Sequence, residues 1–149
     1  MMPPLSAVEQ KFQRFPTVFC RLTGRNGAVR EYQALIVPTA EFCVIPKVDA
    51  YRLGYPEAAG ADARVPIPNT VTFASYMGYG RGTVIKIVRV DIGSMSEGDV
   101  EFLAFDPLQT TGFDMILGRS FLRFMHLDLD FASGSLRLER AAIPQGNPH

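Results

Sequence analysis

Apolar and polar residues alternate along much of the chain, which is the pattern of β-strands with one face in a core. Residues 17–24 and 28–37 alternate in this way and are rich in β-branched and aromatic side chains. Asn26-Gly27 lies between them, and this dipeptide accepts the positive φ angles of a tight hairpin turn. The pattern therefore predicts a hairpin that turns at Asn26-Gly27.

Further strands are predicted in the second half of the chain. Residues 85–93 and 99–106 read as two strands separated by a polar turn at 94–98, and residues 69–93 are β-rich around a glycine-rich stretch. Residues 113–124 predict an apolar strand, a glycine and a short helix near 120–124. Residues 126–140 alternate on both sides of an Ala-Ser-Gly-Ser turn, which predicts a closing hairpin.

One short helix is predicted between the first hairpin and the later strands. Pro46 suits a first helical turn, and Gly54 suits the position just after the last one. The apolar side of this helix would consist of Val48, Tyr51 and Leu53. Residues 56–69 are rich in Ala, Gly and Pro and are predicted to form a loop.

About eight short strands and two short helices predict a mainly β domain, closed into a barrel or stacked as a sandwich. The domain is expected to span residues 17–140. Residues 1–16 would be an extended lead-in, and residues 141–149 a flexible tail. No internal repeat is evident.

Composition excludes several classes of partner. The chain has 149 residues, of which 47% are hydrophobic and 20% charged, as in a folded globular domain. Fifteen basic and fifteen acidic side chains give zero net charge, so no basic field would attract nucleic acid or an anionic membrane. No apolar run approaches the ~20 residues of a membrane helix, and residues 1–15 do not resemble a signal peptide. A cytoplasmic location is therefore expected.

The cysteines and histidines give little chemical signal. Cys20 and Cys43 each lie in an apolar run and are predicted to be buried, reduced thiols, although a disulfide between them stays open. No Cys/His pair has the spacing of metal ligands, so neither a metal nor a cofactor is expected. His126 is interpreted as a strand residue.

The order of these elements resembles the retropepsin-like (retroviral-type) aspartic peptidases over residues 17–140. The most specific part is MILGRSFL at 115–122, which is similar to a segment that in this family threads behind the catalytic turn and leads into a helix. The resemblance implies a closed β-barrel with one or two short helices. Its structural motif falls on Ile116, Leu117, Gly118 and Arg119. Its flap, a mobile hairpin over a bound peptide, falls on Tyr76, Met77, Gly78, Tyr79 and Gly80.

The catalytic motif of that family, Asp-Thr/Ser-Gly-Ala, is not present at the matching position. Counting back from Pro46, the Asp position falls on Val37, and the next three positions fall on Pro38, Thr39 and Ala40. A one-residue shift places Pro38 on the Asp instead. These enzymes share one proton between two aspartates, one from each half, and neither Val nor Pro can hold a proton. In addition, Pro38 would remove an N–H from the turn network.

Four other carboxylates could in principle take the place of the family aspartate. Glu41, beyond the turn, and Asp114, before the Ile-Leu-Gly segment, are the fallback candidates. The ordinary interpretation of Glu41 is a solvent-facing charge, and that of Asp114 is a structural acceptor of backbone N–H groups. Asp128 and Asp130 alternate with apolar residues and are predicted to lie on the solvated face of a strand.

Three functions remain open from the sequence. The first is a non-catalytic retropepsin-like domain, a homodimer that acts as a peptide-binding or assembly module. The alternative is an aspartic-type peptidase that uses a non-standard carboxylate or an active partner subunit. The third is a small β-domain whose resemblance is only topological.

Overall fold

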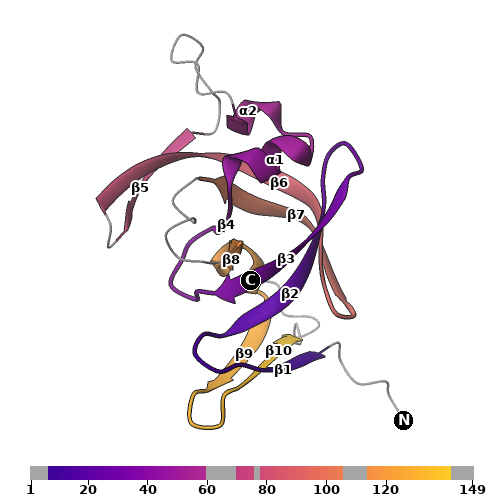
Figure 1. The fold of residues 1–149 in the computed structure, drawn as a ribbon, viewed down its shortest axis with the longest axis vertical. Coiled ribbons are helices and arrows are strands. Elements are labelled where there is room, and N and C mark those ends of the chain that lie inside the picture. The colour runs from indigo at the N-terminus through magenta and orange to yellow at the C-terminus, as the bar shows by residue number, and fades with distance from the viewer. Residues whose placement is uncertain (1–6, 60–69, 76–77, 106–113, 142–149) are drawn as a thin grey trace, which may run out of the picture.

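The fold is a closed β-barrel with a smaller sheet beside one end, in a computed structural model that describes residues 7–59, 70–75, 78–105 and 114–141 (Figure 1). The larger sheet is formed by β2 (Thr17–Thr23), β3 (Val29–Ile36), β8 (Met115–Leu117), β4 (Cys43–Ile45), β7 (Met95–Ala104), β6 (Gly78–Ile92) and β5 (Thr70–Ser75), in that order. Because β6 also pairs with β2, the strands from β2 to β6 in this order form a ring, and β5 extends it. The predicted closed, mainly β fold is confirmed.

The first hairpin turns where the sequence predicts, but by a different geometry. β2 and β3 pair from Thr17↔Leu35 to Thr23↔Val29. In the turn, Gly27 has a φ of +83°, and its N–H donates to the Gly24 carbonyl (3.0 Å). Asn26 does not have positive φ; its side-chain oxygen instead accepts the N–H of Ala28 (2.9 Å). Asn-Gly therefore acts through one side-chain hydrogen bond and one left-handed glycine.

The helix after β4 is present, but its buried side differs from the prediction. α1 (Lys47–Arg52) begins after Pro46 and ends before Gly54, whose φ is +95°. Val48 and Tyr51 are exposed, so the predicted apolar side is wrong except for Leu53. The helix is short and packs through Ala50 and the chain that leaves it, including Leu53 and Tyr55. Residues 56–59 form α2 (Pro56–Ala59) rather than loop.

The β6–β7 hairpin is longer and tighter than the sequence predicts. β6 is one strand of 15 residues, and it joins β7 through Gly93 and Ser94 alone, since Ile92 pairs with Met95. Gly93 has a φ of +59°, which suits the first central position of a two-residue turn. The polar turn expected at 94–98 is wrong, because burial of Met95 in the core keeps this segment in the strand.

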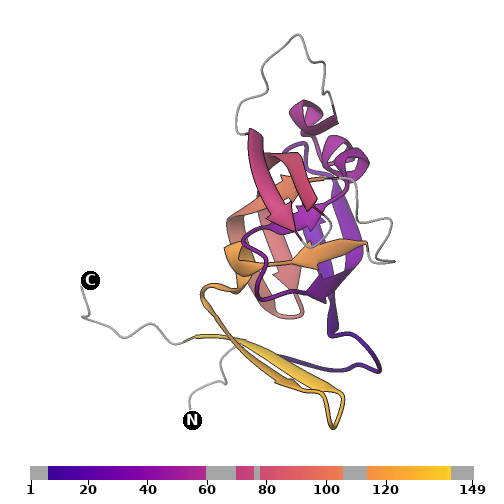
Figure 2. The same cartoon turned by 90° about the vertical axis from the view of Figure 1, so that its left-hand side faces the viewer.

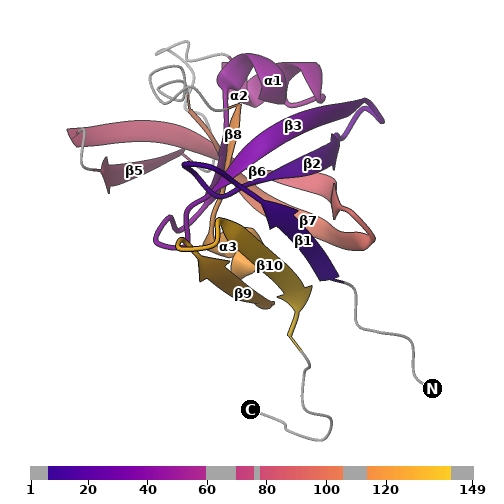
Figure 3. The same cartoon turned by 60° about the horizontal axis from the view of Figure 1, so that its bottom comes forward.

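The smaller sheet contains the closing hairpin and a strand near the N-terminus. Its order is β1 (Ala7–Lys11), β10 (Ser135–Arg140) and β9 (Met125–Asp130), all antiparallel. Residues 7–11 were expected to be an extended lead-in, but pairing with β10 gives them a regular register. Figures 2 and 3 show this sheet at the end of the barrel opposite α1 and α2. Its inner side chains, such as Leu136 and Leu138, join the core.

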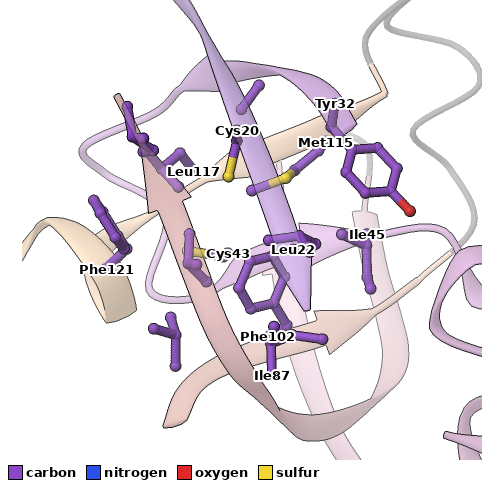
Figure 4. Close-up of a cluster of buried hydrophobic side chains, with 14 of the residues drawn as sticks. Cys20, Leu22, Tyr32, Cys43, Ile45, Ile87, Phe102, Met115, Leu117 and Phe121 are labelled. Carbon is purple, nitrogen blue, oxygen red and sulfur yellow. The ribbon is translucent and has the colours of Figure 1, made fainter. Parts of the chain in front are cut away.

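The barrel interior is filled by apolar side chains from every strand of the ring (Figure 4). Cys20 and Cys43 are both free thiols within this core, as predicted. Burial raises the pKa of both thiols, which keeps them protonated at neutral pH. No helix in the described part of the chain has the length and apolar character to span a bilayer.

Candidate functional site

The segment that follows β3 is a hydrogen-bonded four-residue turn. The N–H of Ala40 donates to the carbonyl of Val37 (3.0 Å), so Pro38 and Thr39 occupy the two central positions. Proline is favoured at the first central position, whose N–H is not used by the turn. Thr39 does not have positive φ. Pro38 therefore fits this turn, and the expected damage to its hydrogen bonding is not seen.

A second segment, the strand β8 and the start of α3 (Arg119–Leu122), holds this turn in place. The N–H of Val37 donates to the carbonyl of Leu117 (3.0 Å). In return, the N–H of Arg119 donates to the carbonyl of Ala40 (2.7 Å), and that of Ser120 to the carbonyl of Glu41 (3.0 Å). Backbone groups on both sides of Gly118 thus bind backbone groups on both sides of the turn.

Gly118 is required by the closeness of this contact. A Cβ atom at this position would lie 2.3 Å from the carbonyl oxygen of Phe42 and 2.8 Å from that of Ala40. Gly118 has a φ of −112°, which any residue adopts, so the constraint is space and not backbone conformation. Its N–H also points to the sulfur of Cys43 (3.3 Å). The glycine of the sequence motif therefore has a physical explanation in this fold.

Ser120 fixes α3 to the barrel. Its hydroxyl accepts the N–H of Cys43 (2.9 Å) and donates to the carbonyl of Glu101 (2.6 Å). One side chain thus connects α3, β4 and β7. The sequence did not single out Ser120 or the Cys43 sulfur as parts of this arrangement, because each is more than 70 residues from one of its partners along the chain.

The turn itself presents no group that can transfer a proton. Pro38 and Thr39 are exposed, and Val37 and Ala40 are half-buried. Glu41 and Asp114 are also exposed, and neither side chain makes a hydrogen bond or ion pair with another described residue. In the described residues, no group of three or more His, Cys, Asp or Glu could hold a metal ion. Residues 37–40 thus carry no carboxylate, and the turn is held by the backbone contacts with β8 and α3.

The other two candidate carboxylates, Asp128 and Asp130, lie on β9, in the smaller sheet. Asp128 is exposed, and its carboxylate lies 3.5 Å from the imidazole of His126. Asp130 accepts the N–H of Ser133 (3.2 Å), which lowers the pKa of its carboxyl group. These residues lie on the solvated face of a strand, as the sequence predicts, and His126 is a strand residue.

The glycine-rich hairpin is formed by β5 and β6. Gly78, Tyr79 and Gly80 belong to β6 and pair with β5 in a regular antiparallel register, whereas Tyr76 and Met77 lie outside the described residues. Figure 1 shows this hairpin projecting to one side of the barrel. Its proposed role as a flap stays a prediction.

The comparisons with known proteins found similarity among solved structures. No protein-family model matches the chain, and no curated protein matches it. The chain is similar to the solved structure of a retropepsin-like aspartic protease from Rickettsia conorii, with 18% identity, a TM-score of 0.49, and coverage of 95% of this chain and 100% of that one. This likeness concerns the fold and not the chemistry of the turn.

Proposed function

We propose that this chain is a non-catalytic retropepsin-like domain that forms a homodimer and acts as a peptide-binding or assembly module. The observation that carries the proposal is the turn at residues 37–40. Its backbone is closed by the hydrogen bond from Ala40 to Val37 and held by β8 and α3, yet residues 37–40 contain no carboxylate. A folded scaffold without the group that activates water supports a role in binding rather than in catalysis.

Restoring the family motif tests whether the missing carboxylate at position 37 accounts for the proposed lack of activity. The combined substitution Val37→Asp, Pro38→Thr and Thr39→Gly places Asp-Thr-Gly before Ala40. We expect weak cleavage of a mixed peptide library at acidic pH, because one carboxyl of a close pair must stay protonated. The single substitution Val37→Asp is the matched control and should stay inactive, because Thr39 keeps a β-branched side chain beside the proposed two-fold axis. A folded triple variant that cleaves nothing would contradict the proposed placement of the motif.

The homodimer is proposed because the turn leaves apolar side chains incompletely covered. Val37, Ala40 and Ile116 are half-buried in the single chain, and Pro38 is exposed beside them. An apolar surface of this kind is a common site of association. Light scattering at high micromolar concentration should give twice the mass of one chain. Thr39→Arg should give monomers, whereas Val29→Arg, at an exposed position at the other end of β3, should not; a monomeric wild type would refute the dimer.

The alternative function, a peptidase with a non-standard carboxylate or an active partner subunit, would require Glu41, Asp114 or a second protein to supply the acid. The exposure of both carboxylates, without a described partner, does not favour this alternative. The module is further proposed to act without a metal or cofactor and in the cytoplasm, where its two free thiols stay reduced. Cell fractionation with an antibody to the chain tests the location.

A further inference from the structure

The dipeptide Asn26-Gly27 is chemically reactive as well as turn-forming. In an Asn-Gly pair, the backbone nitrogen of the glycine can attack the side-chain amide carbon of the asparagine, because a glycine has no side chain that obstructs the attack. Of the three asparagines in the sequence, only Asn26 precedes a glycine. Asn69 precedes Thr70, whose branched side chain obstructs the attack, and Asn147 precedes a proline, whose nitrogen carries no proton.

The structure leaves this dipeptide open to solvent at the tip of the β2–β3 hairpin. Asn26 and Gly27 are both exposed. A Cβ atom at Gly27 would have no neighbour within 4 Å among the described residues, so none of them covers the glycine from that side. Water, which completes the reaction, therefore has access to both residues.

The side chain of Asn26 joins the hairpin tip to the C-terminal end of α1. Its Oδ1 atom accepts the N–H of Ala28 (2.9 Å), and its Nδ2 atom donates to the carbonyl of Arg52 (3.1 Å). The backbone N–H of Asn26 donates to the carbonyl of Leu53 (3.5 Å). The last carbonyls of a helix have no partner within the helix, so Asn26 supplies donors to them from a distant part of the chain.

The rest of the tip lies in direct contact with the same end of α1 (Figure 1). A Cβ atom at Gly24 would lie 2.1 Å from the carbonyl oxygen of Leu53, and one at Gly54 would lie 2.8 Å from the backbone nitrogen of Asn26. Both glycines therefore allow one backbone to approach the other. Because Leu53 is completely buried, separation of the tip from α1 would uncover this part of the core.

We propose that Asn26 is a deamidation site and that its conversion to an acidic residue detaches the hairpin tip from α1. The Gly27 nitrogen forms a bond to the Asn26 Cγ atom and loses its proton, and ammonia leaves from the side chain. Water then opens the resulting five-membered imide at either of its carbonyls, which gives an aspartate or an isoaspartate at position 26. Water is the only co-reactant. This chemistry does not depend on the function proposed for residues 37–40.

An aspartate at this position would repel the end of α1 that the asparagine binds. The oxygen of the present side chain is held by Ala28, so the second carboxylate oxygen would take the place of Nδ2, which lies 3.1 Å from the carbonyl oxygen of Arg52. Both atoms are acceptors, and a negative charge is unfavourable at the carbonyl end of a helix. The neighbouring guanidinium of Arg25 is already engaged by Glu57 (2.8 Å). An isoaspartate would also lengthen the turn by one backbone carbon.

The native turn should slow this reaction without preventing it. The N–H of Gly27 donates to the carbonyl of Gly24 (3.0 Å), and both polar side-chain atoms of Asn26 are hydrogen-bonded. These bonds must open before the nitrogen can reach the side-chain carbon. A hairpin tip opens locally more often than the whole domain unfolds, so modified chains would accumulate slowly with the age of the protein.

The first test follows the mass of one peptide. The full chain is kept at mildly alkaline pH in its native state and, in parallel, unfolded in guanidinium chloride. Trypsin, which cuts after Arg25 and Arg30, then releases residues 26–30. This peptide should gain the mass difference between NH2 and OH in both samples, about tenfold more slowly in the native one. Equal rates would overturn the proposal, as would no gain in the native chain after about a hundred half-times of the unfolded chain.

The second test measures detachment by amide hydrogen exchange of residues 50–55. Exchange there should become about tenfold faster in Asn26→Asp and in aged wild type, which was folded before it was modified. Gln33→Glu makes the same change from amide to carboxylate at an exposed position of the same hairpin, and it should leave exchange at residues 50–55 unchanged. Unchanged exchange in the aged, deamidated wild type would overturn the proposed detachment. Equal acceleration in Gln33→Glu would overturn it as well, because the effect would then not require the contact with α1.

Discussion

Replacing Gly118 with alanine should destabilise the whole domain through the contact between β8 and the turn. The added Cβ would lie 2.3 Å from the carbonyl oxygen of Phe42, whereas ordinary contact begins near 3.4 Å, so one side must move by about 1 Å. Overpacking of this kind costs about 1–3 kcal/mol. The same movement lengthens the 2.7 Å hydrogen bond from Arg119 to Ala40, which adds about 1 kcal/mol. The expected loss in the free energy of unfolding is therefore about 2–4 kcal/mol.

The measurement is urea unfolding followed by circular dichroism, with thermal unfolding as a second assay. The melting temperature of Gly118→Ala should fall by roughly 5–15 °C. Gly98→Ala is the matched control, because a Cβ at Gly98 would lie 3.6 Å from the carbonyl oxygen of Val88 and needs no movement. That variant should stay within about 1 kcal/mol of wild type. Equal stability of the two variants would refute the explanation given for Gly118.

Two further predictions concern titratable groups. Glu57 is paired with Arg25 (2.8 Å), and this pairing lowers the pKa of the Glu57 carboxyl group. The pair therefore stabilises the fold fully at a pH above the pKa of Glu57 in the unfolded chain. This stabilisation is lost as the pH falls through the lower pKa of the folded state. Glu57→Gln should therefore lower the free energy of unfolding at neutral pH, by less than about 1 kcal/mol because both side chains are partly exposed. In acid the variant should be as stable as wild type. A difference in stability that persists in acid would contradict the assignment. Cys20 and Cys43 should not react with a thiol reagent in the native state, because burial raises the pKa of both thiols, and both should react in denaturant. Rapid reaction of the native protein would show that the core opens.

Local sequence signals located most of the elements but not the contacts between them. Asn26-Gly27, Pro46 and Gly54 marked a turn and both ends of a helix, because each acts within a few residues of its place in the chain. The side of α1 that faces the core could not be predicted from its own pattern. Val48 and Tyr51 look like a buried pair at helical spacing, but the core is reached through Ala50 and Leu53. Strand β1 was missed for a similar reason, since its partner β10 is more than 120 residues away.

The resemblance pointed to residues of the candidate site but not to the interactions that hold them. The positions of residues 37–40 and of Gly118 followed from the resemblance. The expectation that Pro38 would disturb the turn is wrong, because the turn type that accepts a proline is a property of the three-dimensional backbone. The parts played by Ser120 and the Cys43 sulfur depend on contacts between distant strands, for which the sequence offers no local signal.

The central claim is that no carboxylate of this chain cleaves peptides, and it is tested most directly with the wild-type protein. Purified wild type and the double variant Glu41→Gln, Asp114→Asn are incubated side by side with a mixed peptide library from acidic to neutral pH, and new termini are detected by mass spectrometry. The account predicts no cleavage above buffer for either protein, because the turn at residues 37–40 has no group to activate water. Cleavage that is equal in both samples and is lost on further purification would identify a contaminating protease, whereas equal cleavage that persists would contradict the account. Cleavage by the wild type that disappears in the folded double variant would contradict the account and would make the chain an enzyme.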